Sequence, residues 1–331
     1  MMNNYHTTTL GNTYELRPSD VLIALEASLF SVLSFSFPNT GTLALFGHTL
    51  SRGWLAGTFM ALIALAAMLL PLIDTRKAPP LVNFVRSFYP QLVTSLFFME
   101  AIFLSSVIFG GYSYDAIFAR WDQHIFGFQP SREFSLALSS SRFVNELMFG
   151  SYFSYYVVLA VTPWIPWIRG NHREAERQIF AFVAVSGLLD LWYVIFRVQG
   201  PKYWFADLHA QWYEHFQGGI FVRFFQGVFE HATLYGAAFP SSHVAEMTLF
   251  SIFAWRIDKR LFALYALITA LVSAATVYLY AHYAVDAIAG FLVSIVLTPL
   301  CLKAWSPSQH LCDRLAAGEA LLERGTKADR R

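Results

Sequence analysis

The chain has 331 residues, of which 56% are hydrophobic and 17% aromatic, whereas only 14% are charged. Soluble domains carry about 25% charged residues, so this composition favours an integral membrane protein. A net charge of +1 without a basic stripe gives no support for nucleic-acid binding. The 2 cysteines, both near the C-terminal end, predict neither a disulfide framework nor a cysteine-ligated zinc site.

Eight apolar segments have about the length needed to cross a bilayer, which is roughly 17–25 residues. They run over 20–37, 54–73, 91–110, 150–168, 178–196, 240–255, 261–280 and 283–302. The intervening segments 111–149 and 197–239 are expected to be long loops on one side of the membrane. The second loop is rich in aromatic residues, which suits either a helix on the bilayer surface or a roof over a lipid-headgroup cleft.

Basic residues indicate the orientation of these spans. They are dense around residues 76–86, 169–177 and 256–260 and in the tail after residue 303. With eight spans all four regions lie on one side, which the positive-inside rule assigns to the cytoplasm together with both termini. The opposite, outer side then carries His243, His282 and Asp286.

A histidine and an aspartate four residues apart form the first candidate for catalysis. His282 and Asp286 would share one face of a helix, so the carboxylate can accept a hydrogen bond from the imidazole. An imidazole held in this way has its other nitrogen free to act as a nucleophile or base. Two other interpretations remain open, a structural histidine at a helix end and a zinc site that also uses His243.

Two further stretches on the outer side predict a phosphate site. In Pro240-Ser241-Ser242-His243 the proline suits the first turn of a helix, where free N–H groups and serine hydroxyls can bind an anion. Lys202 follows a Gly-Pro turn just outside the preceding span. A lysine there can stabilise phosphoryl oxygens, although a lysine at the membrane interface often serves only to extend its amine into water.

In this order, the three stretches resemble the motifs of the type 2 phosphatidic acid phosphatase superfamily of membrane phosphatases and phosphotransferases. That family has a basic motif, then Pro-Ser-Gly-His, then Ser-Arg-x5-His-x3-Asp. Here the second motif reads Pro-Ser-Ser-His and ends at His243, and the third keeps His282 and Asp286.

Departures from the family pattern resemble one branch of it. Thr276 stands where the arginine is expected, Ala275 stands where the serine is expected, and the first motif reads Gly200-Pro201-Lys202-Tyr203. These features are similar to the branch containing inositol phosphorylceramide synthase and sphingomyelin synthase. The other stretches that resemble this branch are 17–20, 122–130, 145–147 and 152–156.

The resemblance implies a mechanism that needs no metal and no cofactor. His282, oriented by Asp286, attacks phosphorus and forms a phosphohistidine, while His243 protonates the departing alcohol and then activates the acceptor. The expected phosphate-binding residues are Lys202, Ser241 and Ser242. A second cation, from Arg197 or Arg223, is expected to replace the missing arginine.

We therefore expect an all-α integral membrane enzyme with about eight transmembrane helices, six of which form a phosphatase-type catalytic bundle. Residues 1–90 would be an N-terminal segment with two transmembrane helices, 91–302 the catalytic bundle, and 303–331 a cytoplasmic polar tail. The expected location is a bacterial inner membrane, with the active site on the outer, periplasmic side.

The expected substrate is a phospholipid or sphingolipid, and two outcomes suit the same site. A transferase would admit an alcohol or polyol acceptor such as inositol, whereas a hydrolase acting on a lipid phosphate or polyprenyl pyrophosphate would admit water. A different class, a non-catalytic transporter or scaffold that reuses the bundle, is the remaining alternative.

Overall fold

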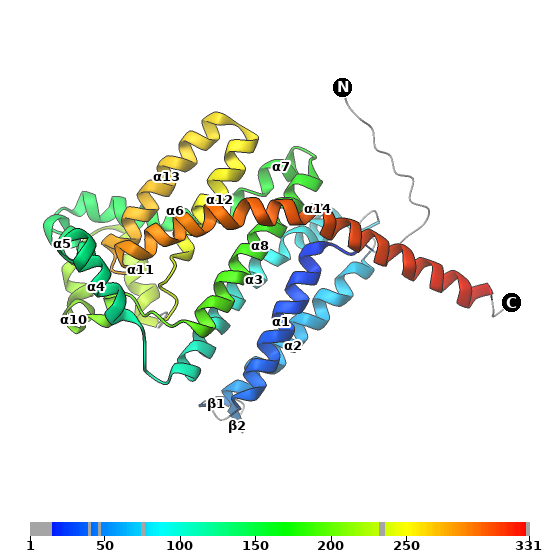
Figure 1. The fold of residues 1–331 in the computed structure, drawn as a ribbon, viewed down its shortest axis with the longest axis horizontal. Coiled ribbons are helices and arrows are strands. Elements are labelled where there is room, and N and C mark those ends of the chain that lie inside the picture. Colours follow the sequence, from blue (N-terminus) through cyan, green and yellow to red (C-terminus); the bar gives the residue numbers. More distant parts are fainter. Residues whose placement is uncertain (1–14, 39–40, 46–47, 74–76, 232–235, 329–331) are drawn as a thin grey trace.

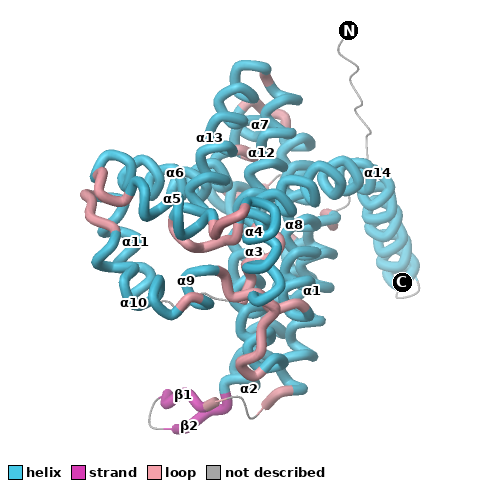
Figure 2. The backbone as a smooth tube through the Cα atoms, turned by 60° about the vertical axis from the view of Figure 1, so that its left-hand side comes forward, coloured by secondary structure: helices cyan, strands magenta, loops and turns pink. Residues whose placement is uncertain are grey.

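The computed structural model describes residues 15–38, 41–45, 48–73, 77–231 and 236–328, and these form an elongated helical bundle (Figure 1). The helices are α1 (Pro18–Ser36), α2 (Arg52–Leu69), α3 (Pro80–Phe109), α4 (Asp115–Phe126), α5 (Pro130–Leu138), α6 (Arg142–Val161), α7 (Trp164–Ile168), α8 (His172–Ile195), α9 (Pro201–Trp204), α10 (Ala206–His215), α11 (Ile220–His231), α12 (Ser242–Ile257), α13 (Lys259–Tyr278) and α14 (Ala284–Ala328). A short hairpin of β1 (Thr42–Leu45) and β2 (His48–Ser51) connects α1 to α2 (Figure 2). The predicted all-α class is confirmed.

Sequence signals for helix boundaries account for many of these ends. Pro18 and Pro80 open α1 and α3, where the missing proline N–H leaves no hydrogen bond unmade. The Asp258 carboxylate caps α13 by accepting from the main-chain N–H groups of residues 260 and 261 at 2.8 and 3.2 Å. Gly110 ends α3 in a left-handed conformation, which glycine adopts without steric cost.

Among the described residues, 6 helical segments are long and apolar enough to cross a membrane. They are α1, α2 with the short 3-10 turn that follows it, α3, α8, α13 and residues 284–316 of α14. Their outward faces carry exposed leucines such as Leu62, Leu65 and Leu92, as expected of side chains that face lipid. The chain is therefore built as an integral membrane protein.

Two of the eight predicted spans, 240–255 and 150–168, are not long apolar helices in the structure. Helix α12 has 16 residues, or about 24 Å at 1.5 Å per residue, and its expected extension through Ala237 and Ala238 is instead extended chain that bridges to Val198. The predicted span 150–168 is divided, because α6 ends at Val161 and α7 begins after Pro163. Both α6 and α12 nevertheless pack inside the bundle, against α13.

The two predicted outer loops are largely helical. Segment 111–149 contains α4, α5 and the start of α6, and segment 197–239 contains α9, α10 and α11. A second hydrophobic cluster, which includes Phe149, Trp212, Phe216 and Tyr278, packs α10 and α11 against α6 and the end of α13. Helix α14 continues beyond the predicted end at 302, and its C-terminal part extends away from the bundle in both views (Figures 1 and 2).

Charged side chains join α1, α3 and α8 near the N-terminal end of α1. Arg86 of α3 donates two hydrogen bonds to the Asp20 carboxylate, at 2.8 and 2.5 Å, and Tyr89 donates a third at 2.6 Å. Arg17 lies 3.2 Å from Glu176 of α8. Because Asp20 and Arg86 are buried, neither charge has water as an alternative partner. Arg17 and Asp20, which belong to the stretch 17–20 named above, therefore have a structural role.

We predict that Arg86→Ala lowers the thermal unfolding temperature of the protein in detergent. Removing one member of a buried ion pair costs about 3–5 kcal/mol because the remaining charge has no partner. Arg256→Ala is the matched control, since Arg256 is partly exposed and lies 3.8 Å from Glu174, a contact worth about 1 kcal/mol or less. Equal unfolding temperatures for the two variants would contradict the anchoring role of Arg86.

Candidate active site

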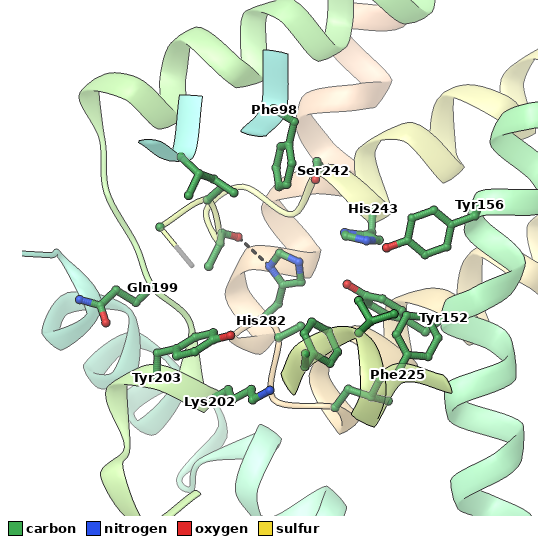
Figure 3. A pocket seen from close by; sticks show the side chains of 18 residues that line it. Phe98, Tyr152, Tyr156, Gln199, Lys202, Tyr203, Phe225, Ser242, His243 and His282 are labelled. Carbon is green, nitrogen blue, oxygen red and sulfur yellow. Dashed lines mark hydrogen bonds between the residues drawn. The ribbon is translucent and has the colours of Figure 1, made fainter. Parts of the chain in front are cut away.

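Two histidines from different parts of the chain face the same cavity. His243 lies in the first turn of α12, and His282 lies in the turn between α13 and α14. Their ring centroids are 5.9 Å apart and their planes are inclined by 65°. Figure 3 shows both rings in the cavity, with Lys202 at its lower edge. The structure therefore brings together residues that are 39 and more positions apart in sequence.

The cavity and the open solvent at its mouth together take up about 760 Å³. Its walls are mainly apolar and aromatic, and they include Phe98 of α3, Tyr152 and Tyr156 of α6, and Phe225 and Phe229 of α11. Helix α11 thus covers part of the site, in agreement with the predicted roof over a cleft.

The His282 ring is held by a main-chain carbonyl, which corrects the prediction that Asp286 holds it. His282 Nδ1 lies 2.8 Å from the Ala238 carbonyl oxygen, a bond drawn dashed in Figure 3, but 3.8 Å from Asp286 Oδ2. A carbonyl only accepts hydrogen bonds, so Nδ1 carries the proton and Nε2 has the lone pair. The Asp286 carboxylate instead accepts from the main-chain N–H of Tyr283 at 2.8 Å, which closes the first turn of α14.

Burial also sets the protonation state of His282. Desolvation lowers the pKa of His282 to about 4, although the hydrogen bond to Ala238 favours the protonated form. The ring is therefore neutral at pH 7. A neutral imidazole with its lone pair on Nε2 is the form that can attack an electrophile.

His243 is positioned by aromatic rings. The Tyr152 ring lies 4.6 Å from it at an angle of 29°, and the Tyr155 ring lies 4.5 Å from it at 47°. Within the part of the chain that the structure describes, neither ring nitrogen of His243 has a hydrogen-bond partner. Both nitrogens are consequently available to a ligand in the cavity.

Lys202 also reaches the cavity, and its turn is packed against the His282 turn. The Lys202 N–H donates to the Tyr280 carbonyl at 2.9 Å, and its ammonium nitrogen lies 3.9 Å from the Trp212 ring centroid and 4.2 Å from that of Phe229. Desolvation lowers the pKa of Lys202 to about 8. The side chain is still mostly cationic at pH 7, and the aromatic faces stabilise that charge.

The two serines of Pro-Ser-Ser-His have different positions. Ser241 is fully buried, and its hydroxyl accepts from the Val244 N–H at 3.4 Å, so it caps α12. Ser242 lines the cavity together with His243. The predicted anion cradle is therefore smaller than expected, because the Ser241 hydroxyl already binds an N–H group of the helix end.

Two aspartates of α4 hold the site together, although no sequence pattern indicated a role for them. Asp115 accepts from the N–H groups of Gln199 and Gly200, each at 2.8 Å, and thereby fixes the turn before Lys202. Asp122 accepts from the first two N–H groups of α14, each at 3.0 Å. Desolvation raises the pKa of both carboxyls, and these N–H groups oppose that rise. Asp122 begins a stretch that resembles the family, whereas Asp115 has no such signal.

Neither arginine proposed to replace the missing one lines the cavity. Arg197 is buried beside Gly236, and Arg223 is exposed on α11. Among the described residues that line the cavity, Lys202 is the cation. Thr276 contributes its main-chain carbonyl, which accepts from the N–H groups of Ala281 and His282 at 3.1 Å.

The zinc alternative lacks a ligand set in the structure. Among the described residues, no three histidine, cysteine, aspartate or glutamate side chains are grouped so that they could hold a metal ion. The Asp286 carboxylate is directed to the Tyr283 N–H group, as described above. The assignment of His243 and His282 to metal binding therefore has no geometric support.

Comparison with known proteins adds one finding. Residues 117–300, more than half of the chain, match the family model described as the PAP2 superfamily. No curated protein and no solved structure is detectably similar to the chain. The matched region contains both histidines, Lys202 and Asp122, and it begins inside α4 and ends inside α14. The chain belongs to the PAP2 superfamily of phosphatases and phosphotransferases that act on lipids.

Proposed function

We propose that the protein is a membrane lipid phosphotransferase that works through a phosphohistidine at His282. The observation that carries the proposal is the placement of His282 and His243 across one cavity, 5.9 Å apart, with Lys202 at its edge. A neutral His282 with its lone pair on Nε2 suits the nucleophile. Phosphoryl transfer needs little else except positioning and charge stabilisation.

The proposed reaction has two balanced steps. His282 Nε2 attacks the phosphorus of the lipid, the bond from phosphorus to the leaving oxygen breaks, and His243, which starts protonated, gives its proton to that oxygen. An acceptor hydroxyl then loses its proton to His243 and attacks phosphorus, and the bond from phosphorus to Nε2 breaks. Lys202 and Ser242 stabilise the phosphoryl oxygens in both steps. Asp286, 3.8 Å from the ring, stabilises its positive charge in the intermediate.

The walls of the cavity favour a lipid with one phosphate and an alcohol acceptor. Among the described residues that line the cavity, Lys202 is the cation, and its single charge cannot balance the several negative charges of a diphosphate. A phosphodiester carries a single negative charge, which Lys202 can balance. The apolar and aromatic lining disfavours bulk water, which a transferase must exclude. A phospholipid or sphingolipid donor with an alcohol or polyol acceptor such as inositol therefore fits best, and hydrolysis of a lipid phosphate is the second candidate.

The orientation and location are part of the same proposal. The dense basic segments support a cytoplasmic position for both termini, so the site would face the outer, periplasmic side of a bacterial inner membrane. Labelling of a cysteine introduced at Ala281 should occur from the periplasmic side. Labelling from the cytoplasmic side alone would contradict this orientation.

We predict acceptor-dependent release of diacylglycerol or ceramide from a panel of phosphodiester lipids. Purified protein in mixed micelles should transfer the labelled headgroup phosphate to inositol or another alcohol faster than it releases it to water. Phosphate release that does not change with added alcohol would favour the phosphatase. Inactivity on every lipid, with the protein folded, would favour the non-catalytic alternative.

His282→Ala should reduce turnover by at least about a thousandfold, because removal of a nucleophile leaves only binding and charge stabilisation. Labelled lipid should give an acid-labile phosphohistidine in the native protein and none in this variant. His124→Ala is the matched control, since His124 is exposed on α4. An undiminished rate in His282→Ala would contradict the nucleophile assignment.

Substitution of His243 is expected to slow two kinds of substrate to different extents. His243→Ala should slow an ordinary lipid by about 10²–10⁴-fold but slow a nitrophenyl phosphodiester far less, because nitrophenolate leaves without a proton. An equal loss on both substrates would show that His243 does not protonate the leaving group.

The activity should fall as pH rises through about 8, because the lowered pKa of Lys202 removes its charge there. Lys202→Arg should retain its charge and keep its activity to higher pH, although its larger head is expected to lower the rate at pH 7. Lys303→Arg, at an exposed lysine of α14, is the control. An alkaline fall that stays near pH 8 in Lys202→Arg would assign that fall to another group.

A further inference from the structure

A buried glutamate on α12 lies one helical turn from His243 but outside the cavity. Glu246 is 5% exposed, and its carboxylate accepts from the Ser186 hydroxyl of α8 at 2.8 Å and from the Tyr155 hydroxyl of α6. Both oxygens of the carboxylate are therefore used. An ionisable side chain at this depth in a membrane bundle is costly, and such residues usually have a function.

Tyr155 joins this glutamate to the site. Its ring lies 4.5 Å from the ring of His243, while its hydroxyl is held by Glu246. The Tyr155 ring is thus fixed at its hydroxyl end by a buried hydrogen bond and lies close to the histidine ring. Since neither nitrogen of His243 has a partner among the described residues, the packing of Tyr152 and Tyr155 determines the orientation of the imidazole.

The same contact acts on the charge of His243. A cation near the face of an aromatic ring is attracted by the ring quadrupole, and more strongly where water is excluded. The protonated form of His243 gains this attraction, whereas the neutral form does not. A tyrosine held firmly against the imidazole therefore favours the protonated form and partly offsets burial, which lowers the pKa of His243.

We propose that Glu246, acting through Tyr155, positions His243 and stabilises its protonated form. The inference rests on the proposed function, in which His243 donates a proton to the leaving oxygen. Glu246 is a positioning residue, since its carboxylate touches Tyr155 and Ser186 and is not among the residues that line the cavity.

Other titratable groups also surround α12 and must be separated from Glu246. Around His243 and Glu246 these groups are Tyr152, Tyr155 and Tyr156 of α6, Asp190 and Tyr193 of α8, Glu26 of α1, Asp286 of α14, and His282 and Lys202 in the cavity. The charges of Glu26 and Glu246 act on Asp190. Asp190→Asn therefore removes a neighbouring ionisable group while leaving the bond between Glu246 and Tyr155 intact.

The test compares Glu246→Gln with Glu100→Gln, a matched change at a buried carboxyl of α3 that binds the Ser34 hydroxyl. Histidine labelled with ¹⁵N in the protein in detergent reports the pH at which His243 titrates, with His243→Gln to assign its signal. In Glu246→Gln we expect the titration to move down by at least about half a pH unit. We also expect kcat to fall at least about tenfold with KM nearly unchanged.

Glu100→Gln and Asp190→Asn should leave the His243 titration in place, and the alkaline fall assigned to Lys202 should not move in any of these variants. If Glu246→Gln does not fold, Tyr155→Phe keeps the ring, lacks the hydroxyl and is measured in the same way. An unchanged titration and kcat would overturn the inference. The titration needs no substrate, so inactivity of the native protein on every lipid would contradict the proposed function alone.

Discussion

Close contact between two turns is the constraint on which the site depends. Gly200 has a φ of +92°, and a Cβ at this position would lie 2.5 Å from the Ala281 carbonyl oxygen. Any larger residue would push the turn that carries Lys202 away from the turn that carries His282. The Lys202 N–H bonds to Tyr280 across the same contact, so the cation and the proposed nucleophile are placed by one main-chain arrangement.

Buried carboxylates maintain this contact because the interior of the protein offers no water as an alternative partner. A buried main-chain N–H without a partner is costly, and helix ends have several such groups. Asp122 satisfies two of them at the start of α14, and Asp115 satisfies two in the turn before Lys202. Since both aspartates belong to α4, this one helix, outside the six apolar spans, fixes the geometry of both turns.

The sequence predicted the membrane class and the six apolar spans, since length and hydropathy alone define them, but it did not predict the helices of the two long outer segments. It failed for α12, where residues 237–238 are apolar but pair as extended chain with Val198, a long-range contact that periodicity does not record. The gathering of His243, His282 and Lys202 in one cavity followed from the ordered motifs. The roles of Asp115 and Ala238 could not be predicted, because one acts through main-chain N–H groups and the other is itself a main-chain carbonyl.

The difference between Ala238 and Asp286 as partners of His282 has a chemical consequence. A carboxylate that holds Nδ1 can also take its proton, so the tautomer would depend on the state of the acid. A carbonyl cannot be protonated in this range, and it therefore keeps the lone pair on Nε2 throughout. In the proposed intermediate the phosphorylated ring carries positive charge, which Asp286, 3.8 Å away and fixed by the Tyr283 N–H, stabilises without a direct hydrogen bond. The Ala238 carbonyl thus sets the tautomer of His282, and the Asp286 carboxylate stabilises the charge of the proposed intermediate. The two tasks depend on different parts of the chain.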